Sequence, residues 1–221
     1  MHTRYKIFII AGEMSGDQIG GLILKEFSKK NNYNLYGVGG NNLKKNGLRS
    51  IFSMDKISLM GLIEIIPKIP VLLSLISFTV NKIIKVDPDI LITIDSQDFN
   101  FRVLQKIKKV KPKLKTVHIV APTVWAWKSN RAKKISKFVD NLFVLFPFEK
   151  KYFVPYKIKT FFIGHPLIEG LISNKYLNNS DKKYFNNLKK TISVFPGSRK
   201  KEILNHLNII LEALVSYKNK L

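Results

Sequence analysis

The feature that most constrains the fold is an alternation of short apolar segments with stretches whose apolar residues recur at helical spacing. Continuous apolar runs suit parallel strands that are covered on both faces, and strands that alternate with helices favour a doubly wound α/β sheet. The sequence therefore predicts an α/β, Rossmann-like fold with a doubly wound parallel sheet. The predicted strands are 6–11, 35–38, 88–94, 116–120, 142–145 and 160–163, and the predicted helices are 19–30, 41–47, 101–110, 130–139 and 148–153.

The chain divides into a long α/β part, a polar stretch and a short third part. Residues 1–172 contain the alternating pattern, and the polar residues 173–190 (SNKYLNNSDKKYFNNLKK) are the best linker candidate. A strand over 191–195 is predicted next, followed by a turn and a helix over 200–220. One strand and one helix cannot close a core of their own. We therefore interpret 191–221 as the incomplete start of a second domain.

The charge of the chain points to an anionic partner. Its 221 residues include 38 Lys and Arg against 15 Asp and Glu, a formal net charge of +23, which suits nucleic acid or an anionic membrane surface. Only five of the basic residues are Arg, and the Lys are spread along the chain, whereas a dedicated DNA reader concentrates Arg on one element. We therefore expect a lipid surface as a partner and no nucleic acid.

Cysteine usage and the N-terminus bear on the cellular compartment. The chain contains no Cys, which excludes a secreted disulfide scaffold and fits a reducing compartment. The N-terminal residues run directly into a strand-like segment and show no signal-peptide pattern. These observations predict a protein that stays in the cytoplasm.

The most apolar part of the chain, residues 57–80, is interrupted by Glu64, Pro67, Lys68 and Pro70. Its uninterrupted remainder is roughly ten residues, and a bilayer span needs about 20 predominantly apolar residues, so no transmembrane helix is predicted. Two interpretations stay open. The segment forms helices packed into the core or a domain interface, or it forms an exposed apolar surface that touches membrane or acyl chains.

The first candidate site is the turn after the first predicted strand, residues 12–17 (GEMSGD). A glycine-containing turn between a strand and a helix N-terminus lets a ligand approach backbone N–H groups closely. Ser15, Gly16 and Asp17 are therefore candidate substrate-binding residues. The alternative is a tight turn in which Ser15 or Asp17 caps the helix. No dinucleotide site is predicted, because GVGG at 37–40 is not followed by the third glycine of that fingerprint.

Two carboxylates follow the predicted strand 88–94, at the sheet edge where open α/β proteins bind ligands. Asp95 comes directly after that strand, and Asp98 follows three residues later. A carboxylate there can accept a proton from a substrate hydroxyl, as a general base does. Asp95 is the catalytic candidate and Asp98 a substrate-binding candidate. The alternatives are that Asp95 braces a turn and that Asp98 caps the helix predicted to begin near Phe101.

Further binding candidates lie in the loops after the next strands. The loop APTVWAWK holds both tryptophans, Trp125 and Trp127, which form either an apolar or sugar-stacking wall or a buried loop anchor. His165, at a strand end beside a proline, either orients a phosphate or holds a loop in place. The four histidines show no metal-ligand spacing, so neither a metal nor a cofactor is expected.

The last candidate is the turn PGSR at the start of the second predicted domain. Helix N-terminal N–H groups and a guanidinium suit a diphosphate, because the helix dipole favours negative charge and Arg binds phosphate oxygens bidentately. Ser198 and Arg199 are therefore candidate substrate-binding residues. The alternative is a capped helix with a surface arginine.

The motifs together resemble one family. In chain order they are AGEMSGD, GVGG, MGLIEIIPKI, IDSQDFNF, PTVWAWKSNRAKKI, FPFEKKYF, FIGHPL and FPGSRKKEI. This set resembles the lipid-A-disaccharide synthases, bacterial inverting glycosyltransferases with two Rossmann domains (GT-B type). The resemblance implies that 1–172 is the acceptor-binding domain and that 191–221 begins the UDP-sugar-binding domain. Family members are markedly longer, so the chain is interpreted as truncated in its C-terminal domain.

The resemblance also implies an activity and a location. The implied reaction transfers 2,3-diacylglucosamine from UDP-2,3-diacylglucosamine to 2,3-diacylglucosamine 1-phosphate and yields the β-1,6-linked lipid A disaccharide 1-phosphate and UDP. The implied location is the cytoplasmic side of the inner membrane of Gram-negative bacteria, with peripheral attachment. Asp95 matches the essential acidic residue of the family and is the candidate base for the acceptor 6-hydroxyl. Arg199 matches the arginine of the PGSR block and is a candidate contact to the donor diphosphate.

Two alternatives to a self-sufficient enzyme stay open. In the first, the chain is half of a split enzyme, and a second polypeptide supplies the rest of the donor domain. In the second, the chain is an inactive fragment that binds acceptor lipid or membrane without turnover. For the reaction that the resemblance implies, the departing UDP needs no metal, since a helix dipole and an arginine can stabilise its charge.

Overall fold

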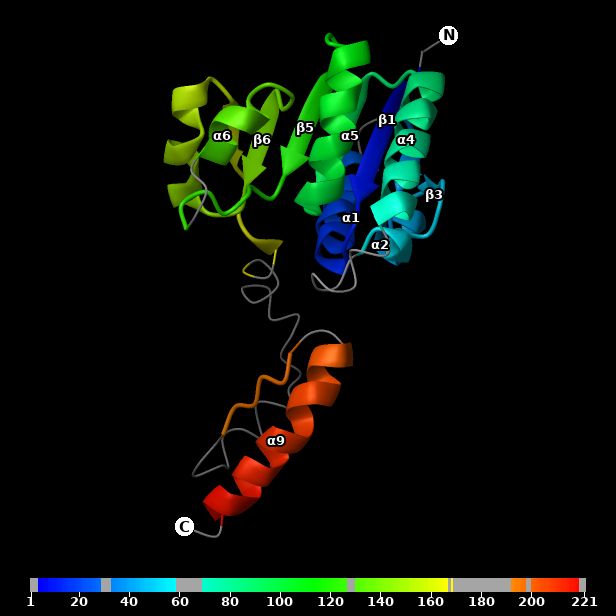
Figure 1. Cartoon of the computed structure of the whole chain (residues 1–221). Helices are drawn as coiled ribbons and strands as arrows, with labels where there is room; N and C mark the ends of the chain where they lie inside the picture. The colour runs from blue at the N-terminus through cyan, green and yellow to red at the C-terminus, as the bar shows by residue number, and fades with distance from the viewer. Residues whose placement is uncertain are drawn as a thin grey trace. The chain divides into compact units, whose positions relative to one another are not determined.

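The computed structural model describes residues 4–28, 33–58, 69–126, 130–166, 168, 192–197 and 200–218 (Figure 1). The chain forms two compact units, residues 1–169 and residues 170–221. The elements of the first unit are β1 (Tyr5–Ala11), α1 (Met14–Ser28), β2 (Tyr33–Val38), α2 (Asn41–Lys45), β3 (Arg49–Ser50), the 3₁₀ turn η1 (Met54–Lys56), α4 (Ile69–Val86), β4 (Ile90–Ile94), α5 (Gln97–Val110), β5 (Lys115–Ile119), α6 (Asn130–Ile135), β6 (Asn141–Val144), the 3₁₀ turns η3 (Pro147–Tyr152) and η4 (Val154–Tyr156), and β7 (Lys159–Phe162).

Seven strands form one parallel sheet in the order β3-β2-β1-β4-β5-β6-β7. The strand order reverses at β1: β2 and β3 extend the sheet on one side of it, and β4 to β7 extend it on the other. This is a doubly wound parallel sheet, so the predicted fold class is confirmed. Open sheets of this kind bind ligands at the carboxyl ends of the strands where the order reverses, which here means the loops after β1 and β4.

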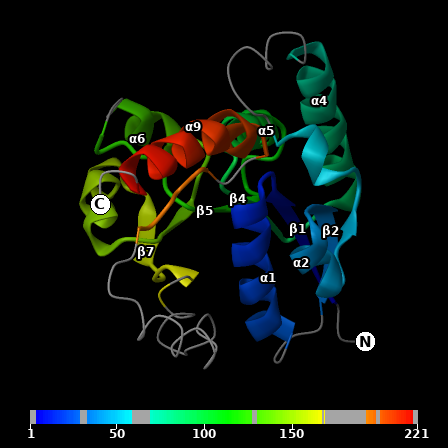
Figure 2. The same ribbon diagram turned by 90° about the horizontal axis from the view of Figure 1, so that it is seen from below.

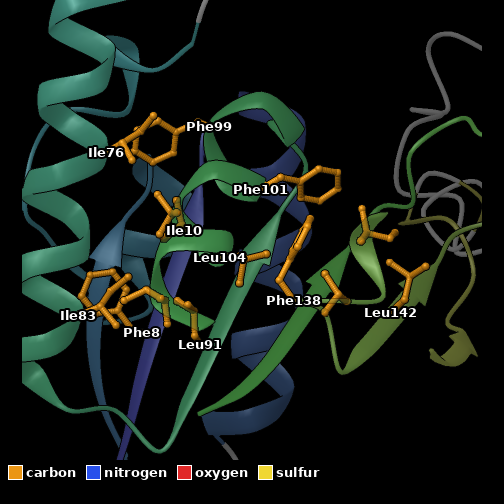
Figure 3. Close-up of a cluster of buried hydrophobic side chains, with 14 of the residues drawn as sticks. Phe8, Ile10, Ile76, Ile83, Leu91, Phe99, Phe101, Leu104, Phe138 and Leu142 are labelled. Carbon is orange, nitrogen blue, oxygen red and sulfur yellow. The ribbon is translucent and has the colours of Figure 1, made fainter. Parts of the chain in front are cut away.

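The two faces of the sheet are covered by different helices, and β1 shows why. Its side chains alternate, so Phe8 and Ile10 join one buried cluster while Ile7 and Ile9 join another. The first cluster includes residues of α4, α5 and α6, and the second includes residues of α1 and α2. Figure 2 shows these two sets of helices on opposite sides of the strands. Figure 3 shows the first cluster, in which Phe8 lies beside Ile83 of α4.

Helix α4 combines the two interpretations left open for the apolar segment 57–80. One side of α4 is buried in the core, through Leu72, Ile76, Thr79, Val80 and Ile83. The other side exposes large apolar side chains, namely Ile69, Val71, Leu73, Phe78 and Ile84. By length and composition α4 could cross a membrane, yet its buried side is that of a helix packed on a sheet. Residues 59–68 of the segment lie outside the described residues.

Several predicted boundaries are corrected. Helix α5 begins at Gln97 rather than near 101, and α6 ends at Ile135 rather than at 139. The helix predicted over 148–153 is the 3₁₀ turn η3, which Pro147 opens. These shifts arise because apolar spacing locates the middle of an element better than its ends.

The second unit contains α9 (Lys200–Lys218) as its described helix. The strand predicted over 191–195 is wrong for the described residues 192–197, which have no regular secondary structure. A strand needs a neighbouring strand for its backbone hydrogen bonds, and residues 192–197 pair with none among the described residues. The predicted linker 173–190 lies outside the described residues, so its assignment and the predicted domain roles stay predictions.

Candidate functional site

The loops after β1 and β4 meet at the carboxyl edge of the sheet through a direct side-chain contact. Ser15, at the start of α1, donates a hydrogen bond from Oγ to Oδ2 of Asp95 at 2.9 Å. Ser15 is exposed and Asp95 is half-buried, so the carboxylate is accessible to a substrate. Two residues predicted as site residues, 80 positions apart in sequence, are therefore brought together at the place where the strand order reverses.

The turn that presents Asp95 has an unusual backbone. Asp95 and Ser96 have φ values of 53° and 42°, in the left-handed region, which Asp enters more readily than most residues other than Gly and which Ser rarely enters. The Asp95 N–H donates to the carbonyl of Ile119 at 3.0 Å. The side chain of Asn100 donates to the carbonyls of Ile94 and Asp95. Asn100 thus braces the turn that contains Asp95, and the Asp95 carboxylate contacts Ser15.

Two glycines allow the loops to approach each other. A Cβ atom at Gly12 would lie 2.1 Å from Oγ of Ser96, and a Cβ atom at Gly16 would lie 3.2 Å from the carbonyl oxygen of Ile94. The first distance is a steric overlap, and the second is a tight contact. Gly16, predicted to bind substrate, therefore has a packing role at the start of α1, where it lets the helix lie close to the end of β4.

Asp17 performs a different task from the one predicted. Asp17 is 3% exposed, and its carboxylate accepts hydrogen bonds from the backbone N–H groups of Gly40, Asn42 and Leu43 at 2.7, 2.8 and 3.1 Å. It also accepts one from Nδ2 of Asn42 at 3.0 Å. Asp17 therefore caps the N-terminus of α2 from α1, whereas the capping alternative considered above concerned its own helix.

Asp98 lies in the first turn of α5, with its side chain 87% exposed. The predicted alternative, that Asp98 caps the helix, is wrong, because Ser96 occupies the N-cap position and α5 has already begun at Gln97. Arg131 of α6 reaches Asp98 and Gln97. Its Nη2 lies 3.7 Å from Oδ1 of Asp98, and its Nη1 donates to Oε1 of Gln97 at 3.4 Å. This arrangement leaves the Asp98 carboxylate largely open to solvent.

Trp125 and His165 belong to one aromatic cluster formed by the loops after β5, β6 and β7. The ring of Trp125 meets that of Phe148 edge-on, with centroids 5.5 Å apart. Phe148 stacks on Phe146 at 5.8 Å, and Phe146 lies 5.7 Å from the imidazole of His165. Trp125, Phe146 and Phe148 are each more than 40% exposed. Trp125 is therefore no buried anchor, and these rings form a partly exposed apolar surface at the carboxyl edge.

The sequence reasoning missed four residues of this edge: Asn100, Arg131, Phe146 and Phe148. Asn100 lies in the same IDSQDFNF block as the two carboxylates. The feature that could have revealed it is a polar amide on the apolar, core-facing side of the helix. The two phenylalanines lie in the FPFEKKYF block. Their signal was the placement of two aromatics at a strand end, where apolar side chains meet solvent.

Three predicted residues, Trp127, Ser198 and Arg199, lie outside the described residues. Within the described part of the chain, no group of three or more His, Asp or Glu residues is arranged to hold a metal ion. The chemistry that the described site offers is therefore that of an accessible carboxylate with a hydroxyl partner. Such a pair can orient a substrate hydroxyl and accept its proton.

Comparison with known proteins identifies the chain's relatives. A family model described as lipid-A-disaccharide synthetase matches residues 7–221. The lipid-A-disaccharide synthase of Rickettsia bellii (strain OSU 85-389) is 42% identical over 210 residues, which are 95% of this chain and 55% of the relative. That of Rickettsia prowazekii (strain Madrid E) is 41% identical over 211 residues, with the same shares covered. The chain thus spans about half the length of these relatives.

A solved structure supports the fold. The UDP-GlcNAc 2-epimerase from Neisseria meningitidis, bound to UDP-GlcNAc, matches with a TM-score of 0.50 at 12% sequence identity. The match covers 83% of this chain and 53% of the epimerase. At this level of identity the likeness concerns the fold alone.

Proposed function

Because the chain belongs to the lipid-A-disaccharide synthetase family, we propose that it supplies the acceptor-binding half of an inverting glycosyltransferase. The proposed reaction transfers 2,3-diacylglucosamine from UDP-2,3-diacylglucosamine to 2,3-diacylglucosamine 1-phosphate. The products are the β-1,6-linked lipid A disaccharide 1-phosphate and UDP. The observation that carries the proposal is the half-buried Asp95 carboxylate, hydrogen-bonded to Ser15 where the strand order of the sheet reverses.

In this mechanism Asp95 is the general base. The acceptor 6-hydroxyl gives its proton to the carboxylate, and its oxygen forms a bond to C1 of the donor sugar. The bond from C1 to the diphosphate oxygen breaks, and its electron pair leaves with UDP. Attack from the face opposite to the diphosphate inverts C1, which gives the β linkage. The Ser15 hydroxyl holds one carboxylate oxygen at 2.9 Å and leaves the other for the acceptor proton.

The aromatic cluster is proposed to contact the acceptor. Trp125, Phe146 and Phe148 expose ring faces and edges at the same sheet edge as Asp95. Aromatic surfaces of this kind pack against sugar rings or against acyl chains, and the acceptor contains both. Truncation of Trp125 to Ala is expected to raise KM for the acceptor with a smaller effect on kcat, because the ring contributes binding in the ground state and in the transition state alike.

The donor side is proposed to depend on Ser198 and Arg199, as contacts to the UDP diphosphate. A second polypeptide that supplies the remaining part of a donor domain is a proposed partner. A transferase assay with and without an added donor half separates a self-sufficient enzyme from a split one.

Membrane attachment is also proposed, with the chain on the cytoplasmic face of the inner membrane. The exposed apolar side chains of α4 would enter the interface, and the net charge of +23 would favour anionic lipid. The test is sedimentation with anionic and neutral vesicles. Phe78→Ser is expected to weaken sedimentation, whereas Val110→Ser serves as a control, because Val110 is an even more exposed apolar position (59% against 41%) and lies at the end of α5. Equal loss in both variants would contradict the assignment to α4.

The decisive test of the reaction is a radiolabel transferase assay with both substrates. Asp95→Asn keeps the size of the side chain and removes the base, and is expected to lower kcat by about 10²–10⁴-fold. Asp87→Asn is the control, because Asp87 pairs with Lys111 just before β4 begins, at the end of that strand opposite to Asp95. Full activity in Asp95→Asn would refute the role of Asp95. Acceptor binding without transfer, even with a donor half present, would refute the proposed reaction and indicate a lipid-binding protein.

A further inference from the structure

The turn that presents Asp95 to the site requires something to hold it. Asp95 and Ser96 both have positive φ, a conformation that persists only where the surrounding structure enforces it. Neither residue is glycine, and left-handed residues in succession are rarer still. A chain released from its neighbours here would return to an ordinary backbone conformation and move the Asp95 carboxylate.

Asn100 is the residue that supplies this restraint. Its Nδ2 donates to the carbonyl oxygen of Asp95 at 2.7 Å and to that of Ile94 at 3.2 Å. Since both partners are carbonyl oxygens, the amide must face them with its nitrogen, which determines its orientation. One side chain on the first turns of α5 thereby links the last residue of β4 to the first residue of the strained turn.

The rest of the Asn100 side chain shows that packing does not account for this choice of residue. Asn100 is 0% exposed, and its Oδ1 has no hydrogen-bond partner among the described residues. A buried unpaired oxygen is unfavourable, and an apolar side chain of similar size such as Leu would fill the space without it. What Asn provides and Leu does not is the pair of N–H donors to the turn.

The remaining contacts of the turn do not replace this restraint. The Asp95 N–H bonds to Ile119, which continues the pairing of β4 with β5 and is compatible with either sign of φ. The Ser15 hydroxyl bonds to the Asp95 side chain, which can follow the backbone. The backbone N–H of Asn100 donates to the carbonyl of Ser96 at 3.0 Å, which is a bond of the first turn of α5. Among the contacts of the described residues, the two side-chain bonds from Asn100 are those that act on the carbonyls on both sides of the Asp95 N–Cα bond.

We propose that Asn100 is a positioning residue for catalysis: it clamps the carbonyls of Ile94 and Asp95 and so keeps the Asp95 carboxylate on the Ser15 hydroxyl. Its catalytic importance rests on the proposed function, in which Asp95 is the base. The clamp itself is a statement about geometry and is tested separately.

The structural test compares crystal structures of the wild-type chain, Asn100→Leu and Asn100→Asp. In Asn100→Leu we expect Asp95 to leave the left-handed region and its carboxylate to move beyond hydrogen-bond reach of Ser15. If Asp95 keeps its positive φ and the 2.9 Å contact in Asn100→Leu, the proposal is overturned, whatever the activity. If Asn100→Leu does not fold, the same comparison is made with Asn100→Asp above its carboxyl pKa, where it has no donor.

The kinetic test uses the conditions under which the wild-type chain transfers, alone or with a donor half. Asn100→Leu is expected to lower kcat about 100-fold at nearly unchanged KM, the scale that a misplacement of about 1 Å produces. Thr116→Val is the matched control: Thr116 is equally buried, and its hydroxyl bonds to Phe138 and Asp140 near the opposite end of the sheet. Thr116→Val is expected to lower thermal stability and to leave kcat unchanged. Wild-type kcat in Asn100→Leu would overturn the proposal.

The pH profile distinguishes the clamp from a general structural role. The carboxyl introduced by Asn100→Asp can donate to the Asp95 carbonyl only while it is protonated, and burial raises the pKa of such a group. Relative to Asn100→Leu, transfer by Asn100→Asp is therefore expected to be highest at acidic pH and to fall as pH rises, because any pH dependence of the general-base step is common to both variants. Identical profiles for the two variants would overturn the proposal. If the wild-type chain shows no transfer, the crystal structures still decide the clamp, and only the proposed function fails.

Discussion

Replacement of Asp17 by Ala is expected to destabilise the first unit strongly, although the sequence motif suggests a ligand contact. The Asp17 carboxylate joins α1 to the N-terminus of α2 through three backbone N–H groups and one side-chain amide. No side chain at the N-cap of α2 itself offers a hydrogen bond. Asp17→Ala therefore leaves three N–H donors unpaired, and one of them belongs to the fully buried Leu43.

The magnitude follows from these contacts. A hydrogen bond to a charged group contributes about 1.5–3 kcal/mol, and loss of an N-cap costs about 1 kcal/mol. The four bonds share one carboxylate and are not additive, so Asp17→Ala is expected to lower the free energy of unfolding by about 4 kcal/mol, the upper range for single substitutions. Asp17→Asn keeps one acceptor oxygen and loses the charge, for which we expect about 2 kcal/mol.

Urea denaturation followed by circular dichroism measures both variants, and thermal melting of Asp17→Ala should fall by about 10 °C for a unit of this size. Asp98→Ala is the control for loss of a carboxylate in α5. Its side chain is 87% exposed and its ion pair is long, so its unfolding free energy should change by less than about 0.5 kcal/mol. If Asp17→Ala unfolds like the wild-type chain but binds the acceptor lipid more weakly, the reasoning is refuted and Asp17 is a ligand.

Three further predictions concern the same unit. Gly12→Ala places a Cβ 2.1 Å from Oγ of Ser96 and should lower the melting temperature by an amount that corresponds to a loss of about 2 kcal/mol in the free energy of unfolding. Adding Ser96→Gly should restore part of this stability, because it removes the clashing atoms and because glycine suits a φ of 42°. If the double variant is no more stable than Gly12→Ala, the steric explanation is contradicted. Burial lowers the pKa of His118 from 6.5 to about 3, so as pH falls the unfolded chain takes up a proton at this histidine before the folded chain does. Between about pH 7 and pH 5, the free energy of unfolding in urea should therefore fall by about 2 kcal/mol more in the wild type than in His118→Leu. Parallel curves of unfolding free energy against pH would show that this histidine is not the cause. Burial raises the pKa of Asp140, but hydrogen bonds from Lys108 and Thr116 outweigh burial and lower the pKa below 3.8. The stabilisation from the ionised carboxylate is therefore present above about pH 4 and is lost as pH falls through the lowered pKa. Asp140→Asn should lose less stability in acid than the wild type, and an equal loss would exclude Asp140 as a cause of the acid sensitivity.

The sequence predicted the class of fold and the edge at which the site lies. Apolar runs such as 6–11 and 88–94 indicated parallel strands, and the sheet contains them as β1 and β4. Because parallel strands bring their carboxyl ends to one edge, the residues following these two runs, Ser15 and Asp95, could be placed at that edge without a structure.

The roles of individual side chains at this edge could not be read in the same way. Asp17 and Ser15 lie two residues apart in one motif, yet one is buried under α2 and the other is exposed beside Asp95. On a helix, residues two apart point in different directions, so their tasks depended on where α2 packs. The aromatic cluster likewise required three loops to be placed beside one another.

Local periodicity therefore determined the elements of this protein and the residues at their ends, because strand and helix patterns depend on neighbours along the chain. Only the tertiary structure decided that β4, not a later strand, lies next to β1, that Ser15 bonds to a residue 80 positions away, and that Asn100 holds the strained turn of Asp95. The physical reason is that strand order and helix packing are set by the burial of both faces of the sheet at once. That condition involves the whole unit, so it cannot be read from any single segment of the sequence.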